Sequence, residues 1–150
     1  MEATPRATAN PLILAAEAVP TKLALWLGIA ARLAGAGIAI FYAFDQSYDR
    51  TQVFMVIIAA LAILSLVPLR PSLEALAASL TSGLLLFSGA VLAQEPAGIG
   101  MLIAGCAGWI GTAITAHHRH VSPGTAVAGL LISSGATVAM LVILALLVEG

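Results

Sequence analysis

The chain has 150 residues, of which 61% are hydrophobic and 9% charged, and its mean hydropathy is +1.06. Soluble domains are usually about 45–50% apolar and about 25% charged, because polar groups must cover their surface. The formal net charge of −1 provides no basic patch for nucleic acid and no acidic tail. These values exclude an ordinary soluble domain and a nucleic-acid partner. They predict an all-α fold, a polytopic integral membrane helical bundle.

Residues 1–20 are predicted to form a cytoplasmic tail. Glu2 and a short apolar run are untypical of a cleaved signal peptide. Asn10 followed by Pro11 resembles an N-cap and a first helical position. We therefore expect either a short interfacial helix over Pro11–Val19, ended by Pro20, or an irregular tail.

Residues 21–150 contain the apolar stretches that a membrane bundle requires. A helix that crosses the hydrocarbon core needs about 20 mostly apolar residues, with a range of about 17–25. Five stretches satisfy this condition, so we predict five transmembrane helices. The predicted spans are Leu23–Phe44, Val53–Leu69, Leu73–Ala93, Ala97–Ala116 and Thr125–Val148.

Residues that favour helix starts precede four of these spans. Thr51 and Ser72 are candidate N-caps, Pro96 is a candidate first residue, and Ser122 with Pro123 combines both features. The second span is the shortest and is followed by "PLRPS", which predicts a tight helical hairpin with the third span.

The distribution of Lys and Arg predicts the orientation. With five spans, Arg6, Lys22, Arg70 and Arg119 fall on the side of the N-terminus, and the other side holds Arg50 alone. The positive-inside rule then places the N-terminus in the cytoplasm and the C-terminus outside. The abundance of Ala and Arg over Lys favours a bacterial source, and hence the bacterial cytoplasmic (inner) membrane.

Small residues at every fourth position predict close helix packing. Helices in lipid associate largely through van der Waals contact, which small side chains permit. The longest such series lies in the fourth predicted span, which we therefore expect at the centre of the bundle, and a shorter one lies in the first. An alternative is that Ala and Gly are simply abundant. The candidate packing residues are Gly100, Ala104, Gly108, Thr112, Ala31 and Gly35.

Arg32 lies near the middle of the first predicted span. Insertion scales assign a central Arg a cost of about 2.5–3.5 kcal/mol. Its side chain could extend to lipid phosphates, pair within the protein or with another subunit, or line a pathway for an anionic or polar solute. Within the chain, Glu74 near the start of the third span is the acid best placed to meet it.

An interfacial cluster, His117, His118, Arg119 and His120, ends the fourth span. His117 and His120 have a spacing that could serve a metal ion, but no Cys or acid lies close in sequence to complete a site. We interpret the cluster as a cationic helix end that offsets the helix dipole and contacts lipid headgroups. No metal site is expected.

Two apolar segments resemble each other. "LLLFSGAVLA" from Leu84 is similar to "LLISSGATVA" from Leu130, roughly 46 residues later. The similarity indicates either a duplication, in which spans two and three match spans four and five, or chance likeness between low-complexity apolar segments. A parallel repeat of this kind occurs in some transporters.

No catalytic motif is present, and no Asp, Glu, His or Lys lies centrally in a predicted span, so we expect no enzyme and no cofactor. An enzyme acting on lipid could draw only on His117–His120. The sequence favours a non-catalytic accessory or assembly subunit of a larger bacterial membrane complex, respiratory or envelope. The alternative is a small homo-oligomeric channel or carrier for a neutral or anionic solute. Expected partners are membrane lipids and other membrane subunits or further copies of the chain.

Overall fold

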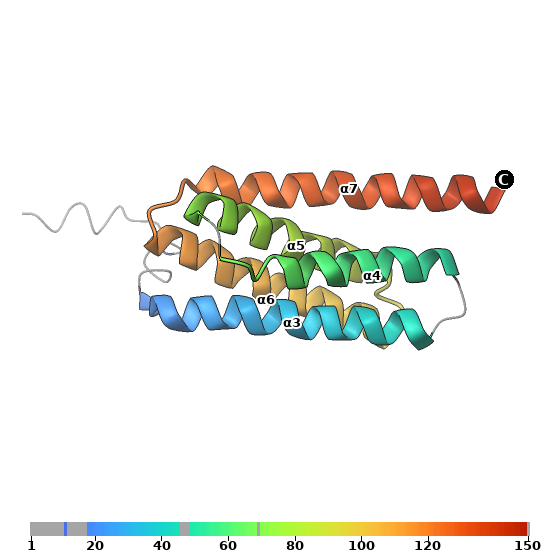
Figure 1. Cartoon of the computed structure of the whole chain (residues 1–150), viewed down its shortest axis with the longest axis horizontal. Helices are drawn as coiled ribbons and strands as arrows, with labels where there is room; N and C mark the ends of the chain where they lie inside the picture. The colour runs from blue at the N-terminus through green and yellow to red at the C-terminus, as the bar shows by residue number, and fades with distance from the viewer. Residues whose placement is uncertain (1–10, 12–17, 46–48, 69, 150) are drawn as a thin grey trace, which may run out of the picture.

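The computed structural model describes residues 11, 18–45, 49–68 and 70–149. Within these residues the chain forms five long helices and no strand, which confirms the all-α prediction (Figure 1). The predicted interfacial helix over Pro11–Val19 lies mostly outside the described residues. The helices are α3 (Thr21–Asp45), α4 (Asp49–Leu64), α5 (Pro71–Val91), α6 (Pro96–His118) and α7 (Pro123–Glu149).

Four of these helices are long and apolar enough to cross a membrane. α3, α5, α6 and α7 contain 25, 21, 23 and 27 residues. At 1.5 Å per residue they extend about 32–40 Å, against a hydrocarbon thickness of about 30 Å. Pro71, Pro96 and Pro123 begin α5, α6 and α7, because proline is favoured at a first helical position, where its missing N–H costs nothing.

α4 is shorter than the predicted second span. It has 16 residues, about 24 Å, and ends at Leu64 rather than Leu69. Pro68 cannot donate a backbone hydrogen bond and disfavours helical geometry at Val67. The chain tightens before Pro68, since the Leu66 N–H bonds to the carbonyl three residues earlier, that of Ile63, at 3.1 Å. α5 begins near the end of the bundle where α3 also begins (Figure 1).

Two predicted N-caps are wrong. Ser72 lies inside α5, because Pro71 takes the first helical position and Arg70 the N-cap position without a side-chain bond. Thr51 lies inside α4, which begins at Asp49. The predicted starts at Pro96 and Pro123 are confirmed.

The helices pack in the spatial order α4, α3, α6, α5, α7. α6 packs mainly against α5 and α3, α7 mainly against α5, and α4 mainly against α3. Successive helices run in alternating directions, so α3 begins at one end of the bundle and α7 ends at the other (Figure 1). α7 therefore lies along one side of the molecule.

The apolar core lies where α3, α4, α5 and α6 meet. Alanine supplies much of it, which keeps the helices close, and larger side chains fill the remaining space. The best buried members are Ala36, Ala39, Ile58, Ala62, Leu85 and Met101.

Candidate functional site

α3 and α6 approach each other backbone to backbone. A Cβ atom added to Gly111 would lie 2.7 Å from the Gly28 backbone nitrogen, closer than any real contact. One turn earlier on α6, a Cβ on Gly108 would lie 3.5 Å from Arg32 Cγ and 2.8 Å from Ser82 Oγ. These glycines allow α6 to approach the α3 backbone and the Ser82 side chain of α5 closely, next to Arg32.

The predicted packing residues of the first and fourth spans lie largely in this contact. A Cβ on Gly100 would touch Ile38, and one on Gly35 would lie 3.3 Å from the Ala104 side chain. Thr112 lies opposite Gly28, and Ala31 is buried.

A second packing face of α6 was not assigned from the sequence. A Cβ on Gly105 would lie 2.6 Å from Leu86 Cα in α5, and one on Gly89 would lie 2.6 Å from the Gly98 carbonyl oxygen. Gly98 and Gly105 are seven residues apart, a heptad spacing. That spacing is the sequence signal that marks this face.

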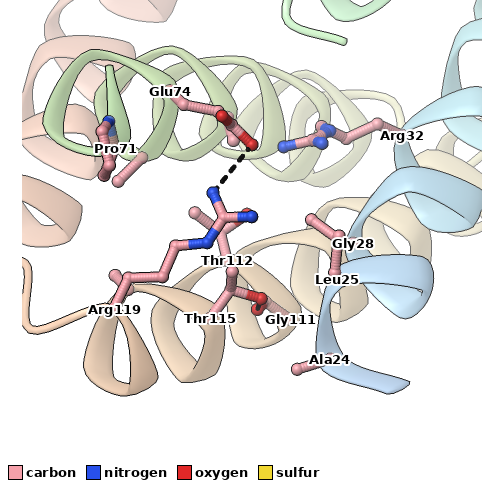
Figure 2. A pocket seen from close by; sticks show the side chains of 13 residues that line it. Ala24, Leu25, Gly28, Arg32, Pro71, Glu74, Gly111, Thr112, Thr115 and Arg119 are labelled. Atoms are coloured by element: carbon pink, nitrogen blue, oxygen red, sulfur yellow. Dashed lines mark hydrogen bonds and ion pairs between the residues drawn. The ribbon is translucent and has the colours of Figure 1, made fainter. Parts of the chain in front are cut away.

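Arg32 lies inside the bundle and not on its outer surface. Its side chain is 5% exposed, and among the described residues its Nε has no hydrogen-bond partner. It lines a cavity of about 20 Å³ between α3, α5 and α6, together with Glu74 and Arg119 (Figure 2). In this position the guanidinium faces Glu74 and not lipid.

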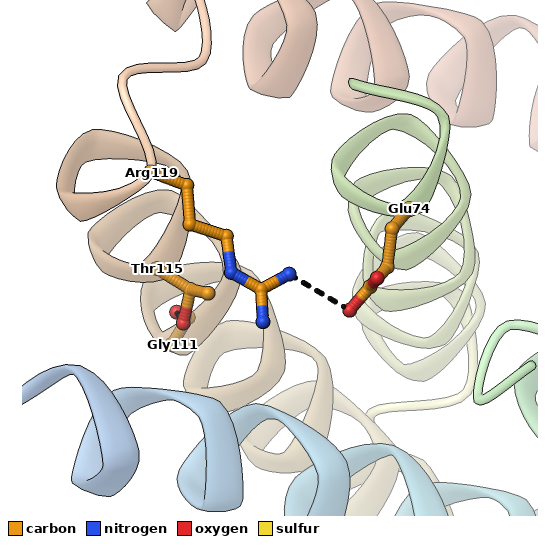
Figure 3. A network of polar contacts seen from close by, with 4 residues as sticks. All are labelled: Glu74, Gly111, Thr115 and Arg119. Atoms are coloured by element: carbon orange, nitrogen blue, oxygen red, sulfur yellow. Dashed lines mark hydrogen bonds and ion pairs between the residues drawn. The ribbon is translucent and has the colours of Figure 1, made fainter. Parts of the chain in front are cut away.

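The Glu74 carboxylate faces two guanidinium groups. Arg119 Nη1 donates to Glu74 Oε1 at 3.2 Å, and the two side chains are 34% and 25% exposed (Figure 3). The Glu74 carboxylate also attracts Arg32 electrostatically. The sequence suggested the pair of Arg32 and Glu74, but the hydrogen bond joins Glu74 to Arg119, which lies 45 residues away in sequence.

Threonine hydroxyls form part of the wall of this cavity. Thr112 and Thr115 line it, and each donates its hydroxyl to the carbonyl one turn earlier, of Gly108 and Gly111, at 2.8 Å. Both hydroxyl protons are therefore used in hydrogen bonds within α6, but the hydroxyl oxygens can still accept a hydrogen bond.

The histidine cluster forms a helix end. His120 has φ 57°, the Val121 N–H bonds to the Ala116 carbonyl at 2.9 Å, and the His120 N–H bonds to the His117 carbonyl at 3.2 Å. These are the bonds of a Schellman motif, in which glycine is usual at the left-handed position. His118 Nε2 lies 2.7 Å from the Val19 carbonyl oxygen. Because His120 has left the helix, it does not share a helical face with His117; among the described residues, no group of three potential metal ligands occurs.

α7 is attached to the bundle by hydroxyl and indole groups. Ser79 Oγ of α5 and Trp109 Nε1 of α6 both donate to the Ala126 carbonyl of α7. A Cβ on Gly129 would lie 2.7 Å from Ser79 Cβ, so α5 and α7 are in close contact here.

Comparison of the chain with protein-family models, with curated proteins and with solved structures finds no match. The fold defines an all-helical protein with four helices suited to a membrane.

Proposed function

We propose that the protein is a non-catalytic accessory or assembly subunit of a larger bacterial membrane complex. In this proposal it resides in the cytoplasmic (inner) membrane, with its N-terminus in the cytoplasm and its C-terminus outside. In this proposal α4 forms a fifth passage, and the excess of Lys and Arg on the N-terminal side supports the orientation.

The observation that carries this proposal is the open space around Gly135 in α7. A Cβ on Gly135 would meet nothing within 4 Å, whereas most other described helical glycines contact a neighbouring helix. A glycine inside a helix costs about 0.5–1 kcal/mol relative to alanine, which close packing elsewhere offsets. Among the described residues nothing offsets it at Gly135 or at Gly37 of α3, which is equally open. The proposal places a helix of another subunit at Gly135, and not at Gly37, because the glycine that corresponds to Gly135 in α5 is in close contact with a helix.

The similar segments of α5 and α7 support the same assignment. Gly89 in "LLLFSGAVLA" corresponds to Gly135 in "LLISSGATVA". Gly89 packs against Gly98 and Leu102 of α6, while its counterpart faces open space. A partner helix at Gly135 would take the place on α7 that α6 takes on α5.

A groove between α4 and α7 gives a second place where the bundle is incompletely filled. Its cavity is about 150 Å³, and its lining is largely apolar, with Phe54 and Met55 from α4 and Met140 and Leu144 from α7. Unfilled space between helices forfeits dispersion contacts, which in lipid are a main source of association.

Two matched substitutions test the proposal. Gly135→Leu and Gly37→Leu each place a side chain in open space, so both variants should fold. Mild-detergent purification of a tagged copy should recover larger partner polypeptides at constant stoichiometry with the native chain and with Gly37→Leu, and lose them with Gly135→Leu. Recovery of the native chain always alone would contradict the accessory role.

The second candidate is a homo-oligomeric channel or carrier, and the buried Arg32 beside a cavity favours it. It requires the native chain to be recovered as a homo-oligomer. Liposomes that contain it should then show anion or neutral-solute flux that Arg32→Ala changes.

A further inference from the structure

The cavity beside Arg32 carries an unbalanced positive charge. Its charged lining consists of two guanidinium groups, Arg32 and Arg119, and one carboxylate, Glu74. The carboxylate hydrogen-bonds to Arg119, the more exposed of the two guanidiniums. Arg32 is only 5% exposed, and its Nε lacks a hydrogen-bond partner among the described residues. A buried charge of this kind is costly unless another group compensates it.

The size of the cavity restricts what can compensate Arg32. Its volume is about 20 Å³, and a space of about 10–15 Å³ on this measure holds one water-sized atom. Figure 2 shows the Arg32 and Arg119 guanidinium groups entering this space from α3 and α6, with Glu74 on α5. The enclosed part of the site therefore holds about one water-sized atom, and it favours an atom that carries negative charge.

We propose that this pocket binds a single monovalent anion through one water-sized atom, contacted by Arg32 from inside and by Arg119 at the mouth. Two sources share this chemistry: a free halide ion, and the charged oxygen of a lipid phosphodiester. The inference does not depend on the accessory role, because the pocket lies between α3, α5 and α6, whereas the proposed partner contacts Gly135 on α7.

The test uses the full chain purified in an uncharged detergent. The thermal unfolding midpoint is measured while sodium chloride replaces sodium gluconate at constant ionic strength, so that a change in the midpoint reports the preference for the small halide and not screening. A ligand that binds only the folded state raises this midpoint as its concentration exceeds its Kd. A parallel series adds phosphatidylglycerol or an uncharged glycolipid, which separates the lipid phosphate from the free halide.

Four variants determine whether the effect belongs to this pocket. Arg32→Gln and Arg119→Gln should each weaken anion binding at least about tenfold, the effect of losing one charge-assisted contact. Glu74→Gln should tighten binding, because it removes a repelling carboxylate and frees Arg119. Arg70→Gln removes a positive charge beside Pro71, outside the cavity lining, and should leave binding unchanged.

The proposal is supported if the midpoint rises and the variants change binding in this pattern. A rise with chloride identifies a free halide as the source, and a rise with phosphatidylglycerol but not with the glycolipid identifies the lipid phosphate. The proposal is overturned by a native midpoint that responds to neither ligand. It is also overturned if the midpoint of Arg119→Gln responds to the ligand as the native chain does, or if Glu74→Gln binds more weakly. Arg119 is partly exposed, so Arg119→Gln should fold even if Arg32→Gln does not.

Discussion

Gly111 of α6 lies directly against Gly28 of α3. A Cβ on Gly111 would stand 2.7 Å from the Gly28 backbone nitrogen and 2.8 Å from the Ala24 carbonyl oxygen. Both obstacles are backbone atoms, which cannot move without moving the helix. This contact sets the distance between α3 and α6, and thereby the width of the space that Arg32 occupies.

Gly111→Ala should therefore destabilise the fold by about 1–3 kcal/mol, the usual cost of overpacking. The measurement is reversible unfolding in mixed detergent micelles. Gly37→Ala is the matched control: it lies in α3 with open space around it, so the same change should stabilise the fold by about 0.5–1 kcal/mol. Equal effects at both positions would contradict the close contact.

Ser79→Ala and Trp109→Phe should both loosen α7, because each removes a donor to the Ala126 carbonyl. Interhelical hydrogen bonds in membrane proteins contribute about 0.6 kcal/mol on average and up to about 1.7 kcal/mol. The stability lost in the double variant should differ from the sum of the losses in the two single variants, since both donors share one acceptor. Ser134→Ala is the control, because the Ser134 hydroxyl donates within α7, to the Leu131 carbonyl. Exchange protection of the α7 amides reports the loosening.

His120→Gly should stabilise the fold by about 1 kcal/mol. A side chain at φ 57° is strained by roughly 1–2 kcal/mol, and glycine relieves that strain. His117→Gly, inside the last turn of α6, should instead destabilise by about 1 kcal/mol. Unfolding midpoints of the two variants measure the difference. A loss of stability in His120→Gly would indicate that the imidazole itself has a stabilising contact.

Glu74→Gln should cost more stability than Arg119→Gln. Removing Arg119 leaves Glu74 with Arg32, whereas removing the carboxylate leaves two guanidinium groups facing each other. A double-mutant cycle should give a coupling of about 0.2–1 kcal/mol for the partly exposed pair, and added salt should reduce it. A greater loss in Arg119→Gln than in Glu74→Gln would be inconsistent with a shared carboxylate.

Hydropathy and proline positions predict most of the fold. The long apolar stretches at Leu23–Phe44, Leu73–Ala93, Ala97–Ala116 and Thr125–Val148 fall within or close to α3, α5, α6 and α7, because apolar length determines what can cross a bilayer. The exception is Val53–Leu69, where the apolar sequence continues beyond Leu64, the last residue of α4 before Pro68.

The polar contacts were harder to predict. Whether Glu74 meets Arg32 or Arg119 depends on the relative depth of α3, α5 and α6 in the bundle, which the sequence of a single helix does not determine. The sequence also left three alternatives for Arg32: lipid phosphates, a partner within the protein or in another subunit, and a solute pathway. The structure places Arg32 in the interior, where it is 5% exposed and lines the cavity with Glu74 and Arg119.

The proposal places the two ends of the bundle on opposite sides of the membrane, which requires α4 to form a fifth crossing beside the four helices that are long enough to span it. The direct measurement labels single cysteines, Thr21→Cys or Glu149→Cys in a Cys106→Ser background, with an impermeant maleimide on intact cells before and after lysis. We expect Glu149→Cys to react on intact cells and Thr21→Cys to react only after lysis. Reaction of both cysteines from the same side would contradict the account.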